Sequence, residues 1–253
     1  MQLLLLLVAC LLSPGLEAVK IVDGHESNPH SRPYMAFLQM QYPHKKCGGF
    51  LIRDDIVLTA VHCWENSITV TLGAHDITKE EPTQQVIPVI RAIPHPAYND
   101  WTSANDIMLL QLKWKAELNA YVRTIRLPGK DESVKPGMVC TVVGWGVRNV
   151  NVMKMSDKLH EADLIVQRRR ICCQEYRYYF YDNSIQICAG EPGTTKASYK
   201  GDSGGPLVCN EVAQGIISLG HRNGTPPRVF TRISSFVPWV EETMRQVTLQ
   251  GPG

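Results

Sequence analysis

Gly201-Asp202-Ser203-Gly204-Gly205-Pro206 is the most informative stretch of this sequence. A serine hydroxyl is a poor nucleophile, so it needs an exposed position, a base, and a site that accepts the oxyanion. Glycines on both sides permit a tight backbone turn, and the amides of Gly201 and Ser203 can point at a developing negative charge. The stretch therefore predicts a nucleophilic serine that carries its own oxyanion hole.

Two further segments supply the partners that such a serine needs. His62 ends the run Leu58-Thr59-Ala60-Val61-His62, and Asp106 stands at the head of the apolar run 107–110. A buried carboxylate there requires partners, and the N–H of a histidine is a good one. Either residue alone would more often be structural, but the chain order His, Asp, Ser is that of a chymotrypsin-type triad.

Composition and charge narrow the class of protein. The 253 residues are 44% hydrophobic and 20% charged, which is ample for one large all-β domain. The net charge is +2, with clusters at Lys45-Lys46 and Arg168-Arg169-Arg170 that suit solvated surface or an acidic partner, and nothing argues for nucleic acid. No pair of cysteines has CxxC spacing, so we expect no metal site and no cofactor.

The strongly apolar run of the sequence lies at the N-terminus. Residues 3–12 are too few to span a bilayer but suit the hydrophobic region of a signal peptide. We expect a signal peptide over residues 1–18, with cleavage after Gly15 as an alternative, and a secreted product without a transmembrane anchor.

From Ile21 to about Arg232, short apolar or alternating runs are separated by Gly, Pro, Asn and Asp. Many short strands with frequent turn signals favour barrels or sandwiches over βαβ units. We expect one helix at about 235–247, with Ser235 as its cap. The predicted strand segments are Ile68–Leu72, 50–52, 56–58, 107–110 and 140–143. The apolar residues at helical spacing are Phe236, Trp239, Val240, Met244 and Val247.

From Ile21 onward the whole chain resembles the trypsin/chymotrypsin family of serine proteases. Ile21-Val22-Asp23-Gly24 is similar to the mature N-terminus of that family. Residues 29–36, 47–50 and 70–75 resemble more narrowly the branch of granzymes, mast-cell chymases and cathepsin G, and granzyme B within it. The resemblance implies two six-stranded antiparallel Greek-key β-barrels, at about 21–125 and 126–232, and a C-terminal α-helix, within one protease domain over 21–253.

The resemblance also implies how the site is assembled and switched on. His62, Asp106 and Ser203 would be catalytic, and the oxyanion hole would use Gly201 and Ser203. Loss of an activation pro-peptide at 19–20 would free the ammonium of Ile21 to pair with Asp202. Losing one partner of such a buried pair costs about 3–5 kcal/mol, so the precursor should be inactive. The activating protease would be a dipeptidyl peptidase or a trypsin-like enzyme.

Seven of the eight cysteines follow the signal segment, which leaves at least one without an internal partner. The family pattern implies three disulfides, of which the third joins Cys188 to either Cys172 or Cys173. The other two pairs implied are Cys47–Cys63 and Cys140–Cys209.

Alignment to the family implies the specificity of the substrate pocket. Ala197 stands where trypsin has its acidic residue, and Arg228 stands where granzyme B carries a pocket arginine. An uncharged substrate side chain would leave that guanidinium unpaired at a cost of about 2–5 kcal/mol, so we expect cleavage after Asp, with Glu less favoured. If Arg228 instead turned outward or paired within the protein, the enzyme would be chymase-like and cut after Phe, Tyr or Leu. The full set of pocket residues is Ala197, Ser198, Lys200, Ser218, Gly220 and Arg228.

The implied partners are protein and peptide substrates, serpin-type inhibitors, granule proteoglycan and the activating protease. Storage in a secretory granule of the cytolytic or mast-cell type would follow. Asn223-Gly224-Thr225 is a glycosylation sequon, so we expect a glycoprotein. The rival interpretation is a protease-fold protein that acts by binding, or as an antimicrobial, with little hydrolysis; the presence of all three triad residues counts against it.

Overall fold

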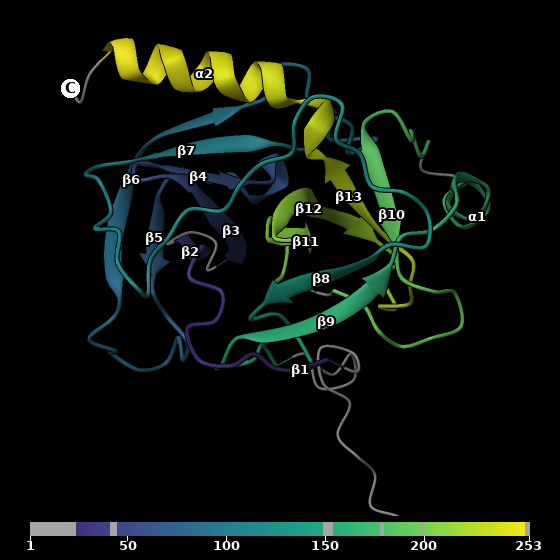
Figure 1. The fold of residues 1–253 in the computed structure, drawn as a ribbon, viewed down its shortest axis with the longest axis horizontal. Helices are drawn as coiled ribbons and strands as arrows, with labels where there is room; N and C mark the ends of the chain where they lie inside the picture. Colours follow the sequence, from purple (N-terminus) through teal and green to yellow (C-terminus); the bar gives the residue numbers. More distant parts are fainter. Residues whose placement is uncertain (1–23, 41–44, 149–153, 178–179, 199, 251–253) are drawn as a thin grey trace, which may run out of the picture.

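The structure is a computed structural model, and it describes residues 24–40, 45–148, 154–177, 180–198 and 200–250. Over these residues the chain forms short antiparallel strands, two short 3₁₀ helices and two α-helices (Figure 1). No helix among them is long and apolar enough to cross a bilayer. The strands are β1 (His25–Glu26), β2 (Met35–Met40), β3 (Lys46–Arg53), β4 (Ile56–Thr59), β5 (Ile68–Leu72), β6 (Gln85–Pro94), β7 (Met108–Leu112), β8 (Val139–Gly144), β9 (His160–Ile165), β10 (Gln186–Ala189), β11 (Pro206–Cys209), β12 (Val212–Gly220) and β13 (Arg228–Arg232).

The first half of the chain closes into a barrel. Its strand order is β2-β3-β4-β7-β6-β5, and β5 returns to pair with β2. The predicted strand Ile68–Leu72 is confirmed as β5, whose alternating pattern places one set of side chains inside the barrel. Strand β7 is buried along its whole length, because it lies between the barrel interior and the C-terminal helix (Figure 1).

The second half forms a seven-stranded sheet in the order β1-β9-β8-β11-β12-β13-β10. The architecture of two barrels predicted from the sequence is confirmed in outline, with one difference in how the second unit closes. Its sheet is completed by an isolated bridge between Val166, just after β9, and Ala189 in β10. Strand β1 adds to the outer edge of this unit, since His25 pairs with Glu161.

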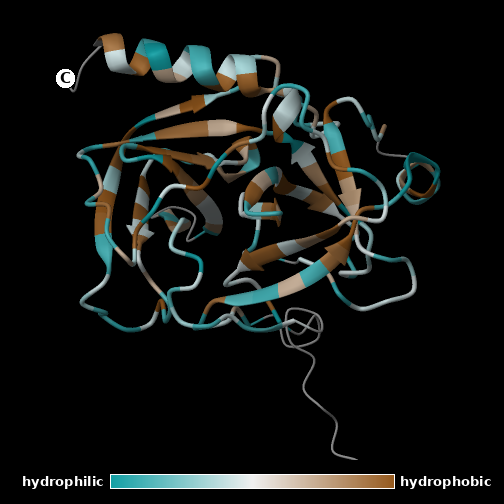
Figure 2. Ribbon diagram, viewed as in Figure 1, coloured by the Kyte–Doolittle hydropathy of each residue, from teal (hydrophilic) through white to brown (hydrophobic). Residues whose placement is uncertain are grey.

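Apolar residues concentrate along the strands, while the connecting loops are mainly hydrophilic (Figure 2). One buried cluster fills the first barrel and reaches across to the C-terminal helix, and a second fills the other sheet. The core is therefore continuous inside each unit, and the segments that join strands are free to build a site between the two units.

The C-terminal helix α2 spans Val237–Gln250 and follows a 3₁₀ helix at Ile233–Ser235. The expected capping role of Ser235 is wrong. Its hydroxyl donates to the carbonyl of Ser184 at 2.6 Å, because the preceding 3₁₀ turn carries it onto a neighbouring loop. A second α-helix, α1 (Arg169–Glu175), was not anticipated, since seven residues are too few for a clear helical period.

Three disulfides are present in the described part of the chain. Cys47 pairs with Cys63, and Cys140 pairs with Cys209. The choice that the sequence left open falls on Cys172, which bonds Cys188, while Cys173 is a half-buried free thiol. Both cysteines lie on α1, whose adjacent positions point in different directions, so only one of them faces β10.

Candidate active site

His62 and Asp106 are brought together by the first barrel. His62 lies in the 3₁₀ helix Val61–Cys63 that follows β4, and Asp106 lies just before β7, which pairs with β4. The imidazole Nδ1 is 2.7 Å from Asp106 Oδ2, and the backbone N–H of His62 donates to Oδ1 at 3.0 Å. The carboxylate thus fixes both the ring and the backbone of the histidine.

Asp106 is fully buried, yet it is held in its charged form. Burial by itself would raise the pKa of this carboxyl, but the charge and N–H groups of His62 and the hydroxyl of Ser218 outweigh it, so the pKa is lowered. Ser218 donates to Oδ2 at 2.6 Å, and the hydroxyl of Thr231 donates to the Asp106 carbonyl at 2.8 Å. Two residues of the second sheet therefore complete a site whose carboxylate comes from the first barrel.

Ser203 lies where the two halves meet. The N–H of Gly48, next to the disulfide that holds the His62 segment, donates to the Ser203 carbonyl at 2.7 Å. On the other side, the N–H of Gly204 donates to the carbonyl of Ile217 in β12 at 2.9 Å. These two hydrogen bonds anchor the turn to both units. The serine itself is half-buried and therefore keeps access to solvent.

The turn around Ser203 requires glycine at both flanks. Gly201 has φ +96° and Gly204 has φ +80°, values that side-chain-bearing residues rarely adopt. A Cβ on Gly204 would also lie 2.1 Å from Thr59 Oγ1 and 2.5 Å from the Gly48 carbonyl. The predicted need for a tight glycine turn therefore has both a conformational and a steric basis.

Asp202 points away from solvent into a cage of glycines. It is 2% exposed, and its Oδ1 accepts the N–H of Gly146 at 2.7 Å. A Cβ on Gly144 or Gly146 would come within 2.1 or 2.4 Å of this side chain. Gly144-Trp145-Gly146, which begins at the last residue of β8, is the sequence signal of this close approach. Ile21, the expected partner of Asp202, lies outside the described residues.

Arg228 enters the second sheet as the first residue of β13, opposite Gly220 of β12. It is 8% exposed, and its Nη1 donates to the carbonyl of His221 at 2.9 Å. A Cβ on Gly220 would lie 2.0 Å from Arg228 Cζ, so the guanidinium lies flat against the glycine backbone. The side chain is therefore turned inward, contrary to the alternative in which it points to solvent.

The other expected pocket residues occupy different environments. Ala197 and Ser198 are fully buried, and Ser198 Oγ has no hydrogen-bond partner among the described residues. Lys200 is exposed, and Tyr199 between them lies outside the described part of the chain. Ser218 directs its hydroxyl to Asp106. A buried hydroxyl that is free to pair suits recognition of a polar substrate group.

Tyr176 supports the pocket segment and was missed from the sequence. It is 1% exposed, its ring stacks on His221 at 4.7 Å between centroids, and its hydroxyl donates to the carbonyl of Pro227. It thereby braces the chain on both sides of the exposed Asn223, whose Oδ1 accepts two hydrogen bonds from Thr225. No local pattern marks such a residue, because its partners lie about fifty positions away.

The two-unit β fold, an imidazole locked by a buried carboxylate, and a serine in a glycine-flanked turn define a serine protease of the chymotrypsin type. Among the described residues, no group of His, Cys, Asp and Glu side chains could hold a metal ion.

Comparison with known proteins gives the family. The family model described as Trypsin matches residues 21–240. The chain is 60% identical to mast cell protease 3 of Ovis aries over 253 residues, which is 99% of each protein. It is 56% identical to granzyme B of Homo sapiens, over 97% of this chain and 100% of that protein.

A solved structure titled "Structure of GrC" matches with a TM-score of 0.84 and 47% identity, covering 88% of this chain and 99% of the other. The chain is also 53% identical to cathepsin G of Homo sapiens, over 98% of this chain and 97% of that protein. The chain therefore belongs to the trypsin family. It is a serine endopeptidase of the granzyme, chymase and cathepsin G type.

Proposed function

We propose that this protein is a secreted granule protease, activated by cleavage before Ile21, that cuts peptide bonds after Asp. The buried, inward-turned Arg228 carries the specificity part of this proposal. A guanidinium enclosed on the protein side by Gly220 and hydrogen-bonded to the neutral carbonyl of His221 favours a substrate carboxylate. Ala197 adds no negative charge at the base of the pocket to compete with that carboxylate.

The chemistry proposed for the triad is that of a chymotrypsin-type site, and the hydrogen bonds between His62 and Asp106 support it. As Ser203 Oγ attacks the substrate carbonyl carbon, His62 Nε2 takes the hydroxyl proton and later gives it to the leaving amine. The Nδ1–H stays bonded to Asp106, which stabilises the imidazolium without taking the proton. The oxyanion would accept hydrogen bonds from the backbone N–H groups of Gly201 and Ser203. Water then attacks the acyl-enzyme, with His62 acting as base again.

Activation is assigned to the cage around Asp202. Strand β1 begins four positions after Ile21 and lies on the second sheet, the half that also holds Asp202. A freed ammonium that entered beside this carboxylate would form with it the buried ion pair that the resemblance implies. Until residues 19–20 are removed, the same nitrogen is a neutral amide, so the oxyanion turn would lack this support.

The remaining assignments rest on the resemblance to granzymes and chymases. A signal peptide over 1–18 and a protease domain over 21–253, with barrels at about 21–125 and 126–232, would give a protein stored in a cytolytic or mast-cell type granule. Lys200, which is exposed, would touch substrate at the mouth of the pocket. Asn223 is exposed and would carry glycan. Protein substrates, serpin-type inhibitors, granule proteoglycan and an activating protease would be its partners.

The test is a substrate profile of protein that begins at Ile21, on peptides that vary only the residue before the cut. We expect Asp to be preferred over Phe, and Arg228→Gln to lower kcat/KM for the Asp peptide about 30-fold or more, which corresponds to losing about 2 kcal/mol or more of charge pairing. The matched control is Arg222→Gln at a neighbouring exposed arginine, which should change little.

Preference for Phe, Tyr or Leu in the unaltered protein would contradict cleavage after Asp and assign the enzyme to the chymase-like alternative. Absence of both hydrolysis and labelling of Ser203 by a fluorophosphonate, with Ile21 verified as the N-terminus, would instead support a protein that acts by binding.

A further inference from the structure

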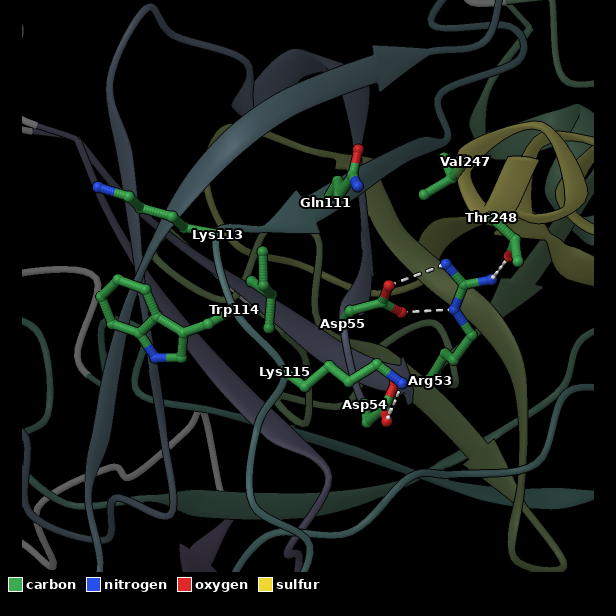
Figure 3. A pocket seen from close by; sticks show the side chains of 10 residues that line it. Arg53, Asp54, Asp55, Gln111, Lys113, Trp114, Lys115, Val247 and Thr248 are labelled. Carbon is green, nitrogen blue, oxygen red and sulfur yellow. Dashed lines mark hydrogen bonds and ion pairs between the residues drawn. The ribbon is translucent and has the colours of Figure 1, made fainter. Parts of the chain in front are cut away.

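A groove lies on the first barrel, at the end of β7 opposite the catalytic carboxylate (Figure 3). We call it the β7 groove; it is formed by the β3–β4 turn, residues 111–115 and the last turns of α2, and its volume is about 630 Å³. Asp106 stands just before β7 and Leu112 ends it, so the groove lies about 20 Å from the triad along an extended strand. It is therefore separate from the catalytic cleft.

Backbone hydrogen bonds hold the floor and one wall of the groove in place. Leu112 and Ala116 donate their N–H groups to the carbonyls of Asp55 and Asp54 at 2.9 and 2.6 Å. In addition, the guanidinium Nη1 of Arg53 donates to the carbonyl of Met244 at 3.1 Å and so ties the end of α2 to the β3–β4 turn. A groove built in this way is preformed, and a ligand would bind without first ordering the walls.

Gln111 gives the groove an unused polar group. The residue is 6% exposed and comes from the buried strand β7, and its carboxamide forms no hydrogen bond with the other side chains that line the groove (Figure 3). The amide atoms are not fully enclosed by protein, so a ligand in the groove can pair with them. A carboxamide offers one acceptor and two donor positions, which match the C=O and N–H of a peptide backbone.

The rim of the groove has an aromatic surface and surplus positive charge. Trp114 is 50% exposed, and its ring lies across the groove from Val247 of α2 (Figure 3). Two acidic side chains are already paired, Asp55 with Arg53 and Asp54 with Lys115. Lys113 is the third basic side chain, and the contact that the structure gives it is with the Trp114 ring, 6.0 Å from its centroid.

We propose that the β7 groove binds an extended segment of a protein substrate that carries an aromatic or large apolar side chain next to an acidic one. Gln111 would pair with the backbone of that segment, Trp114 would pack against its apolar side chain, and Lys113 would pair with its carboxylate. The proposal rests on the proposed function in one respect, because it takes the bound protein to be a substrate that is cut at the cleft. A segment bound in the groove would increase the local concentration of that substrate at the cleft.

Binding is tested with an inert Ser203→Ala protein that begins at Ile21 and the peptide acetyl-Ser-Glu-Phe-Glu-Ser-Gly-amide, titrated by ligand-observed NMR. We expect saturable binding that Trp114→Ala weakens at least tenfold and that Gln111→Leu, which keeps the side-chain volume but removes the polar atoms, weakens about fivefold. The peptide with Ser in place of Phe should bind at least tenfold more weakly.

Two control variants separate the groove from other surfaces. Leu118→Ala removes a side chain that is 52% exposed but lies outside the groove, and it should leave binding unchanged. Arg228→Gln should also leave it unchanged, because that residue belongs to the cleft. No binding, binding that survives Trp114→Ala, or binding lost in Arg228→Gln would each overturn the proposal.

The substrate role is tested with the active protein. A cleavable peptide joined to the Glu-Phe-Glu segment through about 16 Gly and Ser residues has a mean reach of about 22 Å, which is close to the separation along β7. We expect its kcat/KM to exceed that of the unextended peptide about fivefold, and Trp114→Ala to abolish only that gain. Failure of the unextended peptide to react would count against the proposed function, whereas equal rates for both peptides would count against the groove.

Discussion

The two halves of the molecule contribute to the active site in different ways. The first barrel supplies His62 and Asp106 from segments beside the hydrogen-bonded strands β4 and β7, and Asn105, just before Asp106, has φ +58°. The second sheet supplies Arg228 and the turn that holds Ser203, where Gly201 and Gly204 have positive φ and Gly204 has no room for a Cβ. The positive-φ position beside Asp106 tolerates a side chain, whereas the turn around Ser203 depends on glycines that one substitution can undo. The proposed activation step would act on the second half.

Removing the charge of Asp106 tests the first half most severely. Asp106→Asn keeps the size of the side chain but favours the wrong tautomer of His62, so we expect kcat to fall about 10⁴-fold. Steady-state kinetics on the preferred peptide measures the loss, and the thermal unfolding midpoint serves as a check on folding. A loss below about tenfold would show that this carboxylate does not orient His62.

Gly204 tests how strongly the second half depends on its backbone. Gly204→Ala adds a methyl group at φ +80° and 2.1 Å from Thr59 Oγ1, so we expect the free energy of unfolding to fall by about 3 kcal/mol or more. Gly193→Ala is the matched control, since Gly193 has φ +82° but nothing within 4 Å of its would-be Cβ. Its cost should be about 1 kcal/mol. Equal losses in denaturant unfolding would mean that the contact with the first barrel contributes nothing.

The adjacent cysteines on α1 allow a sharper comparison within the second half. Cys173→Ala should leave the free energy of unfolding nearly unchanged. In that background Cys172→Ala opens the loop to Cys188, whose sequence separation is 16, and should cost about 3 kcal/mol. Urea unfolding of both variants measures the difference. A large loss from Cys173→Ala alone would contradict the disulfide assignment.

The smallest expected effect concerns stability in acid, and it involves Glu26, which contacts His75 of the first half and Lys158 of the second. The side-chain bonds of Glu26 to Lys158 and His75 lower the carboxyl pKa from 4.5 to about 2. A lowered folded-state pKa stabilises the protein above the unfolded value, and the contribution is lost as pH falls from about 4.5 to 2. We therefore expect Glu26→Gln to lower the unfolding midpoint by a few degrees at most at pH 6, because the pair is largely exposed. The difference should vanish near pH 2, and a constant offset would indicate a cause other than this carboxylate.

Local patterns in the sequence were sufficient for much of the fold. The period-two run Ile68–Leu72 is β5, and the apolar run after Asp106 is β7, because strands that face a core carry that pattern in their own residues. The order of His62, Asp106 and Ser203 with the glycines around the serine indicated the site. Ser235 shows the limit of this reasoning, since a residue of capping type bonded a distant carbonyl instead.

The sequence by itself determined the type of fold and the family, and it predicted the three residues proposed to carry the chemistry, because these depend on residue types at short spacing. Only the tertiary structure decided that Ser218 bonds Asp106, that Cys172 rather than Cys173 bonds Cys188, and that Arg228 turns inward against Gly220. The β7 groove is likewise a product of the tertiary structure, because its lining residues come from separate parts of the chain. Each depends on which side chains meet after the strands have paired, and residues up to 112 positions apart leave no periodic signal of such a contact.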